Sequence, residues 1–140
     1  MAKHVLLPID IQHEESWKAA LPMARRLMDA GDVLHLLGIV HDVGNAWVAS
    51  YLPKGFEKQA LEKLKYDLEE FAARECQGLE VVPHVSHGHV AETILKKAEK
   101  IGAAMIVMAS HKPDQMRTFR VGSQADRVVA HSPVTVVVVR

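Results

Sequence analysis

The sequence has little of several features that would place it in a common protein class. It contains one cysteine, Cys76, so no disulfide can form within the chain, which agrees with a reducing compartment. Basic and acidic residues number 17 each, so no bulk charge favours nucleic acid or an anionic membrane surface. No apolar run approaches the roughly 18 residues that a membrane span needs. We therefore expect a soluble, cytoplasmic protein with no nucleic-acid or membrane partner.

The chain also lacks the sequence motifs of several catalytic sites. It has no Cys-x-x-Cys, no Gly-Lys-Ser/Thr phosphate loop, no Gly-x-Gly-x-x-Gly and no readable nucleophilic triad. Asp10 stands without the further acidic residues, after the first and third strands, that a phosphoacceptor domain of this topology needs. Because no general base is evident, we expect a binding protein that is at most a slow ATPase.

What the chain does contain is a regular alternation of strand and helix patterns in one domain, residues 1–140. Short apolar runs predict strands at 4–9, 33–40, 79–85, 103–109 and 134–139. Helical spacing predicts a helix from Trp17 to Gly31, with an uneven start at Pro22, and further helices around 61–77, 91–101 and 125–129. Pro83 places the third strand at a sheet edge or bulge. Such alternation predicts a mostly parallel sheet that is covered by helices on both faces.

A ligand crevice is expected where the carboxyl ends of the strands meet. The first, second and fourth strands end at Asp10, Val40 and His111, and two long connections, 41–54 and 110–121, lie at the same edge. After the second connection, Ser123 with Asp126 three residues on is typical of a helix N-cap. Unpaired N–H groups at a helix start attract phosphate, and Lys112, Arg117 and Arg120 precede this one.

Two further patterns have alternative interpretations. The segment HVSHGH brings His84, His87 and His89 close together, and three imidazoles could bind zinc or copper. With one of them inside a strand, two in a turn and no acidic residue adjacent, we expect no metal site.

The final run VTVVVV would be an aggregation-prone edge, so we expect it to pair with its copy in a homodimer or to be covered by a loop.

Taken together, these segments resemble the universal stress protein family over the whole chain. The resemblance rests on HVLLPID at the start, SHGHVAETIL before the third helix and ASHKPDQMRTFRVGSQADRVVAHSPVTVVVVR at the end. Nucleotide-binding members carry Gly, two residues, Gly, nine residues, then Gly-Ser or Gly-Thr. Here Ala109 and Lys112 replace the first two glycines, in a form similar to the branch with Ser-His-Arg/Lys-Pro-Asp, some members of which bind ATP. Gln12 stands where many members have Ser.

The resemblance implies a flavodoxin-like, Rossmann-like three-layer α/β/α fold with strand order 3-2-1-4-5. It implies ATP, with Mg²⁺ as an option, as the ligand of a stress-response module, and a dimer through the fifth strand that could pair into a tetramer. A nucleotide-free interaction protein is the alternative, since a Cβ at Ala109 could crowd the phosphates. The site residues carried over by position are Pro8, Ile9, Asp10, Ile39, Met108, Ala109, Ser110, His111, Gly122, Ser123, Gln124 and Ala125. Lys112 and Arg120 are added to the candidate site as cations of the preceding loop.

Overall fold

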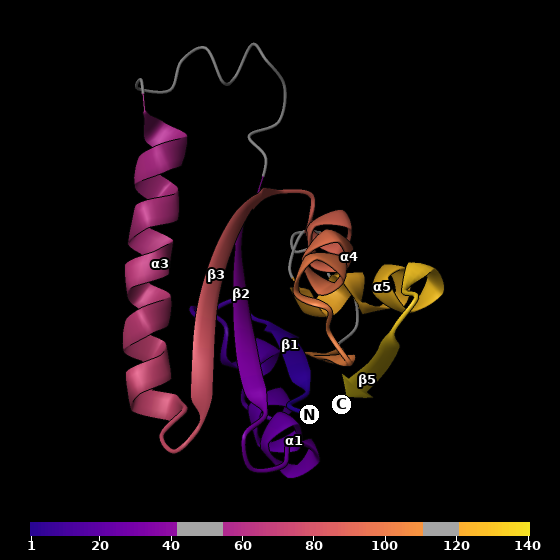
Figure 1. The fold of residues 1–140 in the computed structure, drawn as a ribbon. Helices are drawn as coiled ribbons and strands as arrows, with labels where there is room; N and C mark the ends of the chain where they lie inside the picture. Colours follow the sequence, from indigo (N-terminus) through magenta and orange to yellow (C-terminus); the bar gives the residue numbers. More distant parts are fainter. Residues whose placement is uncertain (42–54, 111–120) are drawn as a thin grey trace.

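One five-stranded parallel sheet forms the centre of the molecule (Figure 1). The computed structural model describes residues 1–41, 55–110 and 121–140, with Gly122 and Ser123 described by their backbone alone. The strands are β1 (His4–Pro8), β2 (Val33–His41), β3 (Glu80–Gly88), β4 (Met105–Ala109) and β5 (Thr135–Val139). Their order is β3-β2-β1-β4-β5, so the predicted flavodoxin-like fold and strand order are confirmed. Pro83 does lie on an edge strand.

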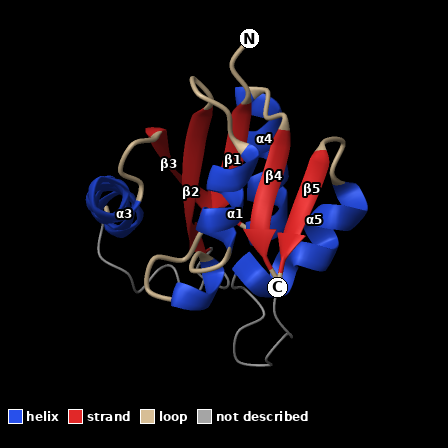
Figure 2. Ribbon diagram, turned by 90° about the horizontal axis from the view of Figure 1, so that it is seen from below, coloured by secondary structure: helices blue, strands red, loops and turns tan. Residues whose placement is uncertain are grey.

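Helices cover both faces of the sheet, and Figure 2 shows the five strands side by side with helices around them. The helical elements are η1 (Glu14–Ser16), α1 (Ala20–Leu27), α3 (Phe56–Glu75), α4 (Val90–Ile101), η2 (Val121–Gln124) and α5 (Ala125–His131). One core cluster joins alternate strand residues such as Leu7 and Leu36 to α1 and α3. The other joins the intervening residues, such as Leu6 and Leu37, to α4 and α5. The alternation of strand side chains between the two faces therefore produces two separate cores.

The boundaries of several elements differ from the predicted ones, and at two of them the structure shows the cause. The first full helix begins at Ala20 and not at Trp17, because a short 3-10 turn precedes it and places Pro22 in the first turn, where a missing N–H is tolerated. Strand β3 continues to Gly88, three residues beyond the predicted end at Val85, because it pairs with β2 along its whole length.

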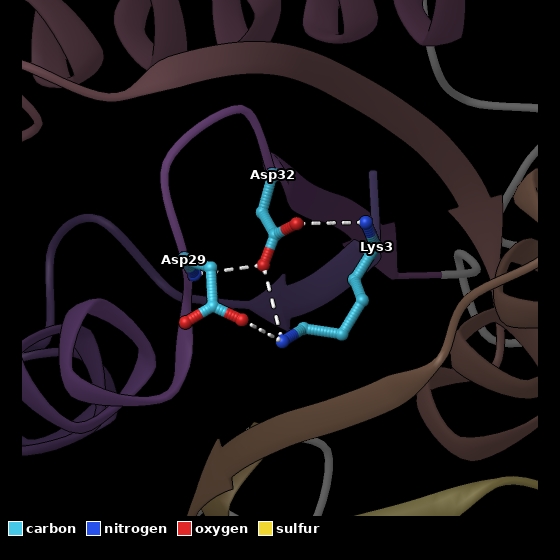
Figure 3. Close-up of polar contacts among 3 residues, drawn as sticks. All are labelled: Lys3, Asp29 and Asp32. Atoms are coloured by element: carbon cyan, nitrogen blue, oxygen red, sulfur yellow. Dashed lines mark hydrogen bonds and ion pairs between the residues drawn. The ribbon is translucent and has the colours of Figure 1, made fainter. Parts of the chain in front are cut away.

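The amino end of the sheet is closed by a brace of Lys3, Asp29 and Asp32, drawn in Figure 3. The Asp32 carboxylate accepts hydrogen bonds from the backbone N–H of Lys3 and from that of Asp29, each at 2.8 Å. The Lys3 ammonium lies 2.8 Å from Asp29 Oδ2 and 3.3 Å from Asp32 Oδ2. The backbone N–H of Lys3 is the main cause that lowers the pKa of Asp32, and the bond to Asp29 is the main cause that raises the pKa of Lys3. The start of β1 is thereby tied to the turn before β2.

Candidate functional site

At the carboxyl end, the tip of β1 is joined to the turn that precedes α5. Ile9 extends the pairing of β1 by donating its N–H to Leu37 O at 3.0 Å. The next residue, Asp10, uses Oδ2 to accept a hydrogen bond from the backbone N–H of Val121 at 3.0 Å. Val121 begins η2 and is fully buried. A carboxylate therefore occupies the first N–H of the Val121–Gln124 turn, where an anion is electrostatically favoured.

The buried hydroxyl of Ser16 holds the backbone of Asp10 in place. Ser16 is 1% exposed, and its Oγ accepts the N–H of Asp10 at 2.9 Å. The same oxygen lies 2.8 Å from the carbonyl oxygens of Asp10 and His13, to which it can donate. Trp17 adds a bond from Nε1 to Ile11 O at 3.3 Å. The turn after β1 is thus fixed by side chains of η1 and of the residue after it, and the position of the Asp10 carboxylate follows from that turn.

The structure brings most of the predicted site residues to one end of the sheet. Pro8 and Ala109 end β1 and β4, Ser110 follows β4, and Gln124 and Ala125 join η2 to α5. Ser110 is held there by a bond from its N–H to Val139 O at 2.9 Å. The η2 turn lies against η1, β4 and α4, so the tips of the two central strands and the start of the last helix are neighbours. Ile39 lies near the end of β2, beside Ser86 of β3.

Several of these residues can offer only main-chain atoms to a ligand. Ile9 is 1% exposed and Met108 is fully buried, and both side chains belong to the core clusters. Ala109 is also buried, in the cluster on the α1 and α3 face. Asp10, Ile39, Ser110 and Gln124 are partly exposed and could present side chains. The predicted residues His111, Lys112, Arg117 and Arg120 lie outside the described residues, as do 42–54 and therefore most of the first long connection.

The start of the last helix differs from the predicted N-cap. Ser123 is not the N-cap of α5: that position is Gln124, which makes no side-chain capping bond. Gly122 and Ser123 instead belong to the 3-10 turn η2, which precedes the α-helix. The tighter turn moves the helix start by one residue, and a backbone N–H of the turn is taken by Asp10 from a distant part of the chain. The Asp10 carboxylate, which follows the first strand, is the group that reaches Val121 of η2.

The predicted histidine group does not form a common centre. His84 and His87 both lie in β3, at positions that face opposite sides of the sheet, and His89 is the residue before α4. His87 Nδ1 is 3.1 Å from Glu57 Oε1 of α3, so the expectation that this histidine lies in a turn with no acidic partner is wrong. Among the residues that the structure describes, no group of three metal-ligating side chains is arranged to hold a metal ion.

Two contributors to this site were missed by sequence reasoning. Ser16 belongs to no sequence motif, and its contact with Asp10 depends on the path of the turn between the two residues. The N–H of Val121 could not be assigned, since its partner is 111 residues away. The sequence did contain one indication of this contact. A carboxylate, Asp10, follows the first strand, and a Gly-Ser turn follows the fourth, at the same edge of the predicted sheet.

The chain belongs to the universal stress protein family, whose model matches residues 1–140. It is 28% identical to universal stress protein G of Shigella flexneri over 145 residues, covering 100% of both chains. The solved structure of hypothetical protein MJ0577 is 25% identical and has a TM-score of 0.76, covering 99% of this chain and 96% of that one.

Two other solved structures of the same fold are complexes with nucleotides. One is a universal stress protein in complex with cAMP, 14% identical with a TM-score of 0.63, covering 99% of this chain and 97% of that one. The other is the universal stress protein from Archaeoglobus fulgidus in complex with dAMP, 15% identical with a TM-score of 0.57, covering 100% of this chain and 98% of that one.

In the described parts of this chain, no helix has the length and apolar character to cross a membrane.

Proposed function

We propose that this protein binds an adenine nucleotide, ATP in particular, at the carboxyl end of its sheet, and acts as a nucleotide-responsive module of the cytoplasmic stress response. The observation that carries the proposal is the contact between Asp10 and the N–H of Val121, which sets the tip of β1 against the start of η2. The crevice beyond the strand ends is where ligands of doubly wound sheets bind. The cAMP and dAMP complexes of family members support the adenine class of ligand.

The backbone N–H groups of η2 and the start of α5 would receive the phosphates. A turn that opens a helix presents N–H groups without helical partners, and Gly122 permits close approach of an anion. Ser123 could add a hydroxyl. Lys112 and Arg120 come from the connection just before this turn and would supply positive charge. Their role rests on their place in the sequence.

Asp10 would act at the other side of the ligand. Its carboxylate is a suitable acceptor for a ribose hydroxyl or a base N–H, or a ligand for Mg²⁺ on the phosphates. Pro8, Ile9 and Ile39 would then lie along the adenine and ribose, the first two mainly through backbone atoms. Ser16 would act as a positioning residue, because it fixes the backbone from which the Asp10 side chain extends.

The replacement of glycine by Ala109 is compatible with this proposal. Ala109 belongs to the core cluster on the α1 and α3 face, whereas Val121 and Ala125 belong to the cluster on the α4 and α5 face. Its methyl group is therefore buried in the core on the α1 and α3 face. Crowding by this Cβ, the physical case for a nucleotide-free interaction protein, is weakened by that burial.

Calorimetric titration tests the proposal. We expect one ATP per chain to bind with saturable heat, and Asp10→Ala to weaken binding by about 10-fold or more, the cost of one hydrogen bond to a charged group. Asp67→Ala is the matched control, since it removes an aspartate that pairs with Lys63 on α3 and has no place in the crevice. Absence of binding heat in the wild-type protein, with ATP, dAMP and cAMP at millimolar concentration and with Mg²⁺ present or absent, would contradict the proposal.

We further propose that β5 forms a homodimer by pairing with its own copy. It is an edge strand, and Val138 on it is 37% exposed, in a segment without charge between Ser132 and Val139. Pairing would remove the open edge and bury the valines.

Sedimentation velocity tests the dimer, and the opposite edge of the sheet supplies a control. Val138→Lys on β5 should convert the dimer into a monomer. Val82→Lys on edge strand β3 removes an equally exposed valine, also at 37%, and should leave the dimer intact. A wild-type monomer, or loss of the dimer in both variants, would argue against β5 as the interface, and a species twice the dimer mass would indicate a tetramer.

A further inference from the structure

Three histidines from adjacent strands form a continuous line of hydrogen-bonding contacts across the sheet. His4 Nδ1 of β1 lies 2.9 Å from His35 Nε2 of β2. His35 Nδ1 in turn lies 2.8 Å from His84 Nε2 of β3. The rings of His35 and His84 are stacked, with centroids 5.1 Å apart and planes at 18°. We call these three residues the histidine ladder.

The ladder lies on the α4 side of the sheet, at the β3 edge. His35 has the same strand parity as Leu37, which belongs to the core under α4 and α5. It is 7% exposed, while His4 and His84 are partly buried. Each ring is offset by two residues from the register partner of its neighbour, because His35 pairs with Leu6 and with Val82. The contacts thus run diagonally and tie β3 to both β2 and β1.

Among the described residues, the charged groups that act on His35 and His84 are cationic. Besides the neighbouring imidazoles, they are Lys97 and Lys100 of α4 and Lys65 of α3. Burial is the main cause that lowers the pKa of His84 to about 4, and Lys97 adds to it. Burial also lowers the pKa of His35, with contributions from His4 and Lys97. Within residues 1–41, 55–110 and 121–140, no carboxylate acts on these two rings to stabilise an imidazolium, so the neutral forms are favoured at neutral pH.

The number of hydrogens that the ladder can hold is limited by its geometry. The three rings have six nitrogens, four in the two contacts and two at the outer ends. Each contact needs one hydrogen, and each outer nitrogen can carry one, so the intact ladder holds at most four. Three neutral rings supply three hydrogens. One added proton therefore fits with both contacts kept, and a second places two hydrogens in one contact and breaks it.

We propose that the histidine ladder is an acid-sensitive latch that holds edge strand β3 on the sheet and releases it when a second proton enters. The direction of the pH dependence follows from the ionisation of the rings in the folded and unfolded states. Histidines that are neutral in the fold and cationic when unfolded stabilise the fold fully above the ordinary pKa of 6.5. That stabilisation is lost as the pH falls from 6.5 towards 4. The loss should be local, at β3 and its pairing with β2.

Hydrogen exchange of the backbone amides tests the latch, with the other edge strand as an internal control. Between pH 7 and pH 4.5, and after correction for intrinsic rates, protection of the β3 amides should fall by at least about 10-fold more than that of β5, since the pKa of His84 is lowered from 6.5 to about 4. In His35→Leu, which removes the middle ring and both contacts, this extra loss should become smaller, and the part that remains comes from the burial of His84. His131→Gln, which removes an exposed histidine from α5, should behave like the wild type.

A second variant and a spectrum keep the test decisive if His35→Leu folds poorly. His84→Gln keeps a hydrogen-bonding side chain that does not titrate, so β3 should stay protected at pH 4.5. Nitrogen-15 spectra of the rings should show one shared hydrogen in each of the two contacts. Equal acid loss at β3 and β5, retention of the β3 loss in His84→Gln, or three rings that titrate independently near pH 6.5 would each overturn the proposal.

Discussion

The two ends of the sheet both use an aspartate to join distant segments, but they use it differently. At the amino end, Asp32 accepts backbone N–H groups and lies beside the Lys3 ammonium, so its charge is balanced within the brace. At the carboxyl end, Asp10 accepts the N–H of Val121, and its backbone rests on the buried hydroxyl of Ser16. The first arrangement closes an end of the sheet. The second fixes the position of a carboxylate at the end where ligands of this fold bind.

The largest loss of stability should come from the carboxyl end. Ser16→Ala removes a hydroxyl that is 1% exposed and leaves the N–H of Asp10 without its partner. We expect the free energy of unfolding to fall by about 1–3 kcal/mol, measured by urea denaturation. Ser132→Ala is the control, because its hydroxyl bonds only partly buried groups of Val134 two residues away. Equal losses in the two variants would show that the Asp10 turn does not depend on Ser16.

At the amino end, Asp32→Asn should cause a smaller loss and should leave nucleotide binding unchanged. The amide keeps one acceptor oxygen, but it loses the charge beside Lys3 and cannot accept both N–H bonds. Asp10→Asn should show the reverse pattern, with weaker nucleotide binding and little change in stability, since one oxygen can still accept the N–H of Val121. Thermal denaturation and ATP titration of the two variants separate these outcomes. Weaker ATP binding in Asp32→Asn would contradict the assignment of a structural role to the amino end of the sheet and a binding role to the carboxyl end.

The pH dependence of stability should separate the brace from the histidine ladder. Asp32 has a lowered pKa, so its contribution is present above the ordinary value of 3.8 and is lost only as the pH falls through the still lower folded value. Lys3 has a raised pKa, so its contribution is present below 10.5 and is lost as the pH rises through the folded value. The difference in unfolding free energy between wild type and Asp32→Asn should therefore stay constant from about pH 5 to 9, and a slope within that range would contradict the assignment.

The smallest effect concerns Cys76, which follows α3 at the amino end of the sheet. The thiol is 2% exposed, and burial raises its pKa to about 11. At pH 8 the thiolate fraction should be ~100-fold below that of an ordinary thiol, so alkylation should be at least that slow in the folded protein. Saturating ATP should not change the rate. An alkylation rate near that of a free thiol would mean that the amino end opens readily.

The strand and helix pattern was readable from the sequence because it depends on local periodicity. The two faces of β1 follow from its alternation, and Pro83 indicated an edge because a strand interior needs the N–H that proline lacks. The sequence predicted a helix start in this region, but it placed the N-cap at Ser123, one residue before the observed N-cap Gln124. A 3-10 turn and an α-helix begin with similar sequences, so the pattern does not separate them.

The contacts that distinguish this chain were not readable, because they depend on register and on distant pairing. His84 was placed in a strand, but its partner His35 lies diagonally across β2, and periodicity gives the face of a residue without its neighbour. The bond from Val121 to Asp10 joins residues 111 apart, and no local pattern encodes it.

The nucleotide carried by the purified protein provides the most direct test of the proposed function. The protein is denatured, and the supernatant is separated by ion exchange and compared with nucleotide standards. We expect an adenine nucleotide at about one per chain, or, if it is lost during purification, a rise in the melting temperature with millimolar Mg-ATP. Absence of bound nucleotide together with an unchanged melting temperature in Mg-ATP would contradict a nucleotide site at the Asp10 and Val121 end of the sheet.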